Sequence, residues 1–233
     1  MTKLAPIQQI NWNKFKIDCD VAYFIGVLHS DASTYKFRNK VRLNLSVAKK
    51  SLPMAIKFQK ILLQRFRRKV NVRKVANKNS FVIQTSIVKL WGVIKTWTKY
   101  QLAEQIRRSR LLFGSYLAGL IDGDGHIKLK HNKDRRLNQL QIRITGPISI
   151  VMVKGLVEKF TTSKVHYVNY KTKACKDTCF YLTHKNLNFM EKFVIPQMVI
   201  PTKIKRLKDH SKKIKWACRD SKFSAARAFL QHP

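Results

Sequence analysis

Two acidic stretches hold the residues whose types and spacing could do chemistry. Residues 117–125 read LAGLIDGDG, an apolar run at helical spacing that ends in Asp122 and Asp124. Residues 24–32 follow a similar apolar pattern, and Asp31 is their last charged residue. The chain carries a formal net charge of +36, and carboxylates on such a surface repel the phosphates that it attracts. They are better explained as ligands of a divalent cation, because Mg²⁺ takes hard oxygen ligands and shares its shell with substrate phosphates.

The two stretches align with each other without a gap. The alignment places Gly26 on Gly119 and Asp31 on Asp124. A glycine has no Cβ and lets another backbone come close, so two helices that meet at these glycines would each bring one carboxylate to a shared site. The first stretch is degenerate, because His29 stands where the second has its first Asp, and an alanine replaces the last glycine.

The amino-acid composition indicates what kind of molecule this protein binds. The 233 residues include 48 Lys and Arg against 12 Asp and Glu. Charge of this size repels itself unless it is neutralised, and nucleic acid is the usual polyanionic partner. A membrane partner is not expected, because no apolar run reaches the ~18 residues of a transmembrane helix. The four cysteines are scattered, and no His or Cys at zinc-binding spacing completes a structural zinc site.

Alternating segments predict β-strands with one basic, solvated face. Residues 35–47 are apolar at nearly every odd position and basic or polar at the even ones, and residues 126–130 and 139–145 alternate in the same way. Lys36, Arg38, Lys40 and Arg42 then share one face, although a turn near Asn39 would divide this segment into a hairpin. We expect such faces to contact phosphates and base edges. The residues expected to contact nucleic acid are Lys36, Arg38, Lys40, Arg42, Asn44, Lys49, Asn71, Arg73, Lys128, Lys130, Gln139, Gln141, Arg143 and Lys171.

The predicted elements occur twice in the same order, which is helix, hairpin, helix, hairpin, helix. Two copies are too few for a solenoid, so we predict a pseudo-twofold pair of domains, 1–109 and 110–233, with the boundary near Ser109. Other expectations are an irregular arm at 1–16, a helix at 21–28 capped by Asp18, a helix at 54–66 after Ser51, a helix that opens at Ser86, a basic linker at 101–114 and a basic helical tail from Lys205.

The stretch 117–125 resembles the signature of the LAGLIDADG homing endonucleases and differs from it only at Gly123. Residues 24–32 resemble a degenerate copy of the same signature. The resemblance implies an α+β fold, a duplicated αββαββα unit in which each half has an antiparallel sheet and the two sheets form a DNA-binding saddle. It also implies that the two signature helices pack side by side, with their acidic ends together beneath the saddle.

The resemblance implies roles for particular residues. Asp31 and Asp124 are expected to be catalytic and to hold divalent metal ions, with help from the backbone carbonyls of Ser30 and Gly123. A basic residue from each half commonly completes such a site, and the candidates are Lys99 and Lys203. Mg²⁺ is the expected cofactor, and Ca²⁺ is expected to support binding with little cleavage.

The function implied is a monomeric, site-specific endonuclease that cuts both strands of a long duplex DNA target. Two alternatives stay open: an RNA-binding maturase that helps its host intron to splice, and a non-catalytic DNA-binding regulator. Retention of Asp31 and Asp124 favours the nuclease, because neither alternative needs a metal-binding carboxylate pair. The expected location is intracellular, with an organelle and a prokaryotic or phage nucleoid both open.

Overall fold

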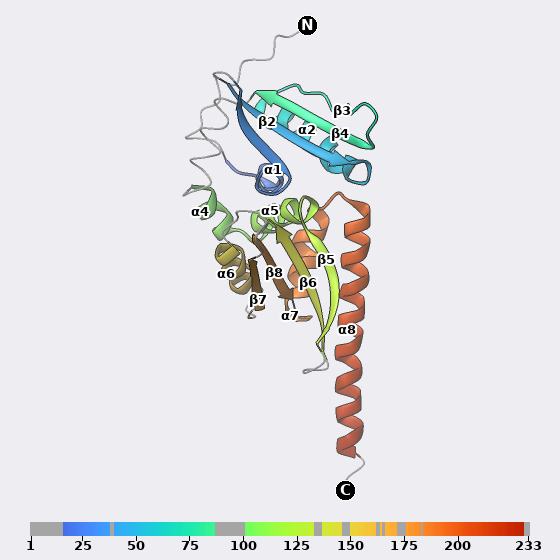
Figure 1. The fold of residues 1–233 in the computed structure, drawn as a ribbon. Helices are drawn as coiled ribbons and strands as arrows, with labels where there is room; N and C mark the ends of the chain where they lie inside the picture. The colour runs from blue at the N-terminus through green and yellow to red at the C-terminus, as the bar shows by residue number, and fades with distance from the viewer. Residues whose placement is uncertain are drawn as a thin grey trace.

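The computed structural model describes residues 16–37, 40–86, 101–132, 137–145, 150–161, 164, 166–171, 176–182 and 184–230. Two halves meet along a pair of helices, and each half contains one four-stranded antiparallel sheet (Figure 1). The strands follow the same order in both, β1-β2-β4-β3 in the first sheet and β5-β6-β8-β7 in the second. This repetition confirms the predicted α+β fold with a duplicated unit. No helix among the described residues is both long and apolar enough to cross a membrane.

The first half contains two helices and one sheet, with a 3₁₀ turn at Lys49–Ser51 before the second helix. Its elements are α1 (Cys19–His29), β1 (Ala32–Phe37), β2 (Lys40–Ala48), α2 (Leu52–Phe66), β3 (Arg73–Lys74) and β4 (Ser80–Ser86).

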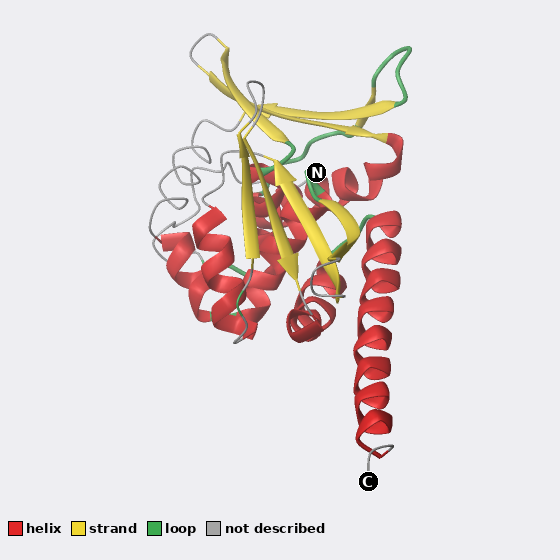
Figure 2. Cartoon of the chain, turned by 60° about the horizontal axis from the view of Figure 1, so that its bottom comes forward, coloured by secondary structure: helices red, strands yellow, loops and turns green. Residues whose placement is uncertain are grey.

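The second half repeats this order and adds helices at both ends. Figure 2 shows its strands lying over a layer of helices, with the last helix beside the sheet. Its elements are α4 (Gln101–Arg108), α5 (Arg110–Asp122), β5 (His126–Asn132), β6 (Leu137–Thr145), α6 (Ile150–Thr161), β7 (His166–Lys171), β8 (Lys176–Leu182), α7 (His184–Phe189) and α8 (Pro201–Leu230), with a π turn at Met190–Val194 and a 3₁₀ turn at Ile195–Gln197 between the last two helices.

The helices α1 and α5, the signature helices, begin at side-chain caps and are buried along most of their length. The Asp18 carboxylate accepts a hydrogen bond from the backbone N–H of Val21, and the Ser109 hydroxyl accepts one from Leu112. Such caps satisfy backbone donors that have no partner inside the helix. Both helices are apolar on all sides, which is typical of a helix enclosed by its neighbours. They form the centre of the core.

The structure adds detail to several sequence expectations. Residues 101–114, expected to join the two halves, do so as α4 and the start of α5. Ser86 is the last residue of β4, where its backbone pairs with Arg42. The second hairpin of the first half is short, since β3 has only two residues. The arm at 1–15 and the helix expected after Ser86 lie outside the described residues.

Candidate active site

The signature helices pack backbone against backbone at Gly26 and Gly119. A Cβ placed on Gly26 would lie 2.2 Å from the carbonyl oxygen of Tyr116, and one on Gly119 would lie 2.2 Å from that of Tyr23. Both distances are far inside van der Waals contact, so only glycine fits at either position. The close approach predicted from the aligned glycines is confirmed, and it brings the C-terminal ends of the two helices together.

Asp31 and Asp124 lie side by side just beyond those ends. The two carboxyl groups are close enough for Asp124 to act on Asp31 both by hydrogen bonding and through its charge. Burial raises the pKa of Asp31 to about 7, with further contributions from the hydrogen bond and the charge of Asp124. The nearby ammonium of Lys203 works in the opposite direction. The pair therefore resists carrying two negative charges unless a cation is present.

Lys203, at the start of α8, closes the C-terminal end of α5. Its ammonium donates to the backbone carbonyls of Ile121 at 2.8 Å, Asp122 at 2.8 Å and Gly123 at 2.6 Å. The last carbonyls of a helix lack partners inside it, although that of Ile121 also accepts from the backbone N–H of Gly125 at 3.0 Å. A cation here also offsets the negative end of the helix dipole. Burial lowers the pKa of Lys203, while the nearby carboxylates oppose that shift. The Gly123 carbonyl expected to assist the metal thus already accepts a hydrogen bond from Lys203.

Asp122, the first aspartate of the signature, is completely buried. Its Oδ2 accepts hydrogen bonds from the Tyr23 hydroxyl at 2.9 Å and from the backbone N–H of Val199 at 2.7 Å. Burial raises the pKa of Asp122, and these hydrogen bonds and the charge of Lys203 moderate the rise. Asp122 therefore joins α5, α1 and the segment before α8.

His29 holds the aligned position in the first half. Its Nδ1 lies 2.9 Å from the Tyr116 hydroxyl, and the two rings meet edge to face with centroids 5.7 Å apart. Burial lowers the pKa of His29 to about 4, so the ring is neutral at physiological pH. Tyr23 and Tyr116 are themselves aligned positions. Each helix therefore sends one tyrosine across to the polar residue at the end of the other.

Ser30 explains the one departure from the family signature. A Cβ on Gly123 would lie 2.0 Å from the Ser30 hydroxyl oxygen, which itself donates to the carbonyl of Gly26 at 3.0 Å. Ser30 and Gly123 are aligned positions that touch across the pseudo-twofold axis. The side chain on one of them fills the space that a side chain on the other would need.

The open face of the first sheet is polar. In β1 and β2, Tyr35 pairs with Arg42, whereas Lys36 pairs with Val41. Directly paired positions on antiparallel strands lie on the same face, so position 36 is in phase with Val41 and not with Arg42. The expectation that the four basic positions from 36 to 42 share one face is therefore wrong, because the chain reverses between β1 and β2. Described residues on the open face are Tyr35, Arg42, Asn44, Ser46, Arg73 and Gln84.

The second sheet follows the expected register. Lys128 pairs with Gln141, Lys130 pairs with Gln139, and Arg143 lies in phase with both pairs. The alternate residues Ile127, Leu140 and Ile142 are buried in the core. This confirms that the basic and amide positions of β5 and β6 share one face. Their contact with DNA remains a prediction, and the side chains at 130, 139 and 143 lie outside what the structure describes.

Other predicted residues fall at the edges of the sheets or outside the described residues. Lys49 is exposed in the turn after β2, and Asn71 is exposed just before β3. The register at the end of β7 pairs Lys171 with Lys176, out of phase with the positions of Arg143 and Gln141. Arg38 and Lys99 lie outside the described residues.

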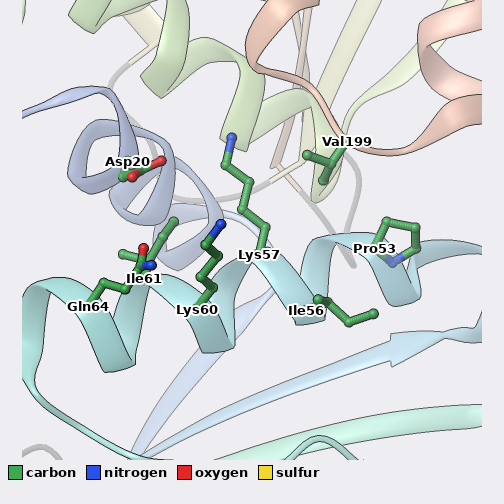
Figure 3. Close-up of a pocket in the computed structure, with 8 residues that line it drawn as sticks. All are labelled: Asp20, Pro53, Ile56, Lys57, Lys60, Ile61, Gln64 and Val199. Atoms are coloured by element: carbon green, nitrogen blue, oxygen red, sulfur yellow. The ribbon is translucent and has the colours of Figure 1, made fainter.

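Two further residues near the site were not singled out from the sequence. Tyr23 could have been found from the same alignment, since it falls on Tyr116 one position before Phe24. Lys57 carries no such signal. It extends from α2 toward the second half (Figure 3), donates to the carbonyl of Gln197 at 2.9 Å and lies 3.8 Å from the centre of the Tyr23 ring. It borders a hollow of about 500 Å³ between α2 and Val199, and neither Asp31 nor Asp124 lines that hollow.

Comparison with known proteins identifies the fold. No family model and no curated protein matches the chain. I-DmoI in complex with DNA and Ca matches it with a TM-score of 0.57 and 13% identity, covering 82% of this chain and 98% of that one. The I-LtrWI LAGLIDADG homing endonuclease bound to target DNA matches with a TM-score of 0.55 and 11% identity, covering 88% and 92%. This chain has the LAGLIDADG fold.

The fold of this chain is also similar to that of DUF199/WhiA. Full-length DUF199/WhiA from Thermatoga maritima matches with a TM-score of 0.51 and 12% identity, covering 95% of this chain and 72% of that one. Identities of this size establish the fold alone. Evidence for chemistry therefore comes from the site of this chain.

Proposed function

We propose that this protein is a metal-dependent DNA endonuclease that binds a specific duplex and hydrolyses both strands at the site formed by Asp31 and Asp124. The observation that carries the proposal is that these two carboxylates, one from each half, lie close enough together for Asp124 to raise the pKa of Asp31. They lie at the ends of paired helices in a chain of net charge +36. A purely structural role leaves the cost of holding two half-buried acids together unexplained.

The carboxylate pair suits a divalent cation. Burial and the neighbouring acid raise the pKa of Asp31, and a bound cation would remove the reason for that shift. No group of three or more His, Cys, Asp or Glu comes together in the described part of the chain. Asp31 and Asp124 would thus hold the metal with water and phosphate oxygens, which fits Mg²⁺, with the Ser30 and Gly123 carbonyls as further ligands. When bound, the metal activates water and stabilises the leaving oxygen.

Lys203 acts in this proposal as a positioning residue. An ammonium has three protons, and all three point at the carbonyls of residues 121–123. They are therefore not available to a phosphate in this arrangement. Lys203 instead holds the turn that carries Asp124, and its charge favours ionisation of Asp31. The expected catalytic role of Lys99 stays a prediction.

The open faces of the two sheets would hold the duplex. A β-sheet can enter the major groove, and the first sheet offers a prearranged pair there, since Arg73 donates to the Gln84 side chain at 2.8 Å. That contact orients the guanidinium and leaves its other N–H groups for base edges or phosphates. Lys128 and Gln141 occupy the matching face of the second sheet.

The test begins with selection of a bound duplex from a randomised library, followed by cleavage in Mg²⁺ and gel-shift of the same duplex. We expect Asp31→Asn and Asp124→Asn each to lower double-strand cleavage by at least roughly 10³-fold, about 4 kcal/mol of barrier, without weakening binding. Glu104→Gln, which removes an exposed carboxylate on α4, should cut like the parent. Ca²⁺ in place of Mg²⁺ should preserve the gel-shift with little cutting.

Two outcomes would overturn the proposal. Cutting of both strands by Asp31→Asn at the parent rate would mean that the two carboxylates do not form one site. Failure of the parent to cut any selected duplex, with tight binding of its host intron RNA, would favour the splicing cofactor instead.

A further inference from the structure

The last helix, α8, has one side held against the second half. Leu207, Ser211 and Ile214 are buried. The Ser211 hydroxyl donates to Glu191 at 2.7 Å, and the Lys215 ammonium donates to the other carboxylate oxygen of the same residue at 2.5 Å. These contacts fix the rotation of the helix, and therefore decide which of its residues face outward.

The outward side of α8 is basic. Five exposed cations lie within nine residues, and Asp209 is the single acid among them. A helix rises about 1.5 Å per residue, so five positive charges occupy a stretch of about 12 Å. The five residues, here called the α8 basic face, are Lys205, Arg206, Lys208, Lys212 and Lys213.

The α8 basic face differs from the basic residues of α4 and α6 that form ion pairs. On α4, Arg107 and Arg108 pair with Glu104, and on α6, Lys154 pairs with Glu158. Among the described residues, no ion pair includes any member of the α8 basic face. Soluble surfaces usually mix charges of both signs. Repulsion left uncompensated within one helix favours an external anion.

The position of α8 places these charges alongside the second sheet, in the first half of the helix. Thirty residues give the helix a length of about 45 Å, whereas the seven residues of β5 extend about 23 Å. Both views show α8 running beside the second sheet and continuing past its end (Figures 1 and 2). The helix begins at Pro201, and Lys203 in its first turn lies near the carboxylate pair. The α8 basic face therefore starts two residues after Lys203 and runs along the helix away from the carboxylate pair.

We propose that the α8 basic face binds the phosphate backbone of duplex DNA beside the segment held by the second sheet. Duplex DNA carries one negative charge per ~1.7 Å of its axis, so a row of cations about 12 Å long matches several phosphates. Lysine is suited to such contacts because its ammonium acts as a point charge without base preference. That the ligand is DNA rests on the proposed function, but binding by the α8 basic face requires no cleavage.

The experiment measures the salt dependence of binding by the full chain to a labelled random-sequence duplex of about four helical turns, about 40 base pairs. The test variant carries Lys205→Gln, Lys208→Gln and Lys212→Gln together. The matched control carries Lys60→Gln, Lys69→Gln and Lys185→Gln, which remove three exposed charges from α2, the loop after it and α7. We expect the slope of log K against log salt to fall by about 0.9 per lost phosphate contact, and so by about 2–3 in the α8 variant and much less in the control.

Equal changes of slope in the two triple variants would overturn the proposal, because α8 would then contribute only to net charge. A loss of binding by the α8 variant for single-stranded RNA, with duplex binding unchanged, would overturn it in favour of an RNA surface. Cleavage separates this proposal from the proposed function. A saturating concentration of the α8 variant should cut the selected duplex at the parent rate, and a parent that cuts nothing would leave the slope difference intact.

Discussion

The C-terminal ends of the two signature helices share their backbone geometry and differ in their chemistry. Gly26 and Gly119 meet the opposite helix equally closely, since a Cβ added to either would lie 2.2 Å from a carbonyl oxygen. Beyond them, the second helix ends at a buried acid, Asp122, and the first ends at a neutral His29. Each of these residues bonds the tyrosine of the other helix. The contact between the helices requires glycine at both positions, whereas the position at the end of each helix holds two different side chains, Asp122 and His29, that each bond a tyrosine.

The largest effect should come from a side chain at the helix contact. Gly26→Ala and Gly119→Ala each place a methyl group against backbone that cannot move without separating the helices. Overpacking of a core costs about 1–3 kcal/mol and sometimes more, and we expect about 3 kcal/mol or more in both variants. Chemical denaturation measures the loss. Gly155→Ala, where a Cβ would meet nothing within 4 Å, is the control and should be neutral or stabilising. A clear difference between Gly26→Ala and Gly119→Ala would break the symmetry of the contact.

The next effect concerns the two polar ends. Asp122→Ala leaves the Tyr23 hydroxyl and the Val199 N–H without their acceptor in a fully buried place, and we expect a loss of about 2–4 kcal/mol. His29→Ala leaves only the Tyr116 hydroxyl without a partner, and we expect about 1–2 kcal/mol. Urea unfolding of both variants, with Tyr23→Phe and Tyr116→Phe as partners in double-mutant cycles, measures each coupling. Equal losses would mean that Val199 adds nothing to the second end.

The pH dependence of stability should differ in sign between two groups of the first half. The pKa of Asp31 is raised to about 7, so the folded state holds a proton that the unfolded state releases, and Asp31 lowers stability as pH rises from about 4 to 7. The pKa of His29 is lowered to about 4, so His29 lowers stability as pH falls from about 6.5 to 4. We expect Asp31→Asn to stabilise the metal-free protein at pH 8 by roughly 1–3 kcal/mol.

Thermal unfolding between pH 4 and 8 checks both slopes. Asp31→Asn should remove the falling slope, and His29→Asn should remove the rising one. Mg²⁺ should stabilise the parent more at pH 8 than at pH 6, because it competes with the Asp31 proton. If the Asp31→Asn protein were no more stable than the parent at pH 8, the ionised Asp31 would not destabilise the folded state, and this prediction would be wrong.

The smallest effect should come from the contact of Ser30 with Gly123. Gly123→Ala should destabilise by about 1–2 kcal/mol, because a small side chain such as Ser30 can shift to make room. Ser30→Gly should restore most of that loss in the double variant, whereas Ser30→Gly alone should cost less than Gly123→Ala. Denaturation of the four proteins of this cycle measures the coupling. Simple addition of the two losses would show that the residues do not compete for space.

The spacing of residues within single segments of the sequence predicted most of the helices and strands. The signature at 117–125 and its copy at 24–32 predicted two helices, the glycine contact and the meeting of Asp31 with Asp124, because all of these depend on spacing within one helix and on the repeat. Alternation predicted the strands of the second sheet and their faces, since a strand that continues without a turn keeps its period of two.

Tertiary structure decided what spacing alone leaves open. The turn between β1 and β2 changed the phase of Lys36 relative to Arg42, because a reversal of the chain resets which positions share a face. Lys203 was marked as a catalytic candidate, yet its ammonium meets the end of α5, since only the packing of α8 places its three protons on three carbonyls.

The residue types of this chain therefore determined where a carboxylate pair, a basic surface and two close-packed helices had to form. Which partner each polar group took depended on distances between segments far apart in sequence. The Tyr23–Asp122 and His29–Tyr116 pairs join residues 99 and 87 positions apart. Buried polar groups must find partners, and only the folded chain decides which partner lies within hydrogen-bond reach.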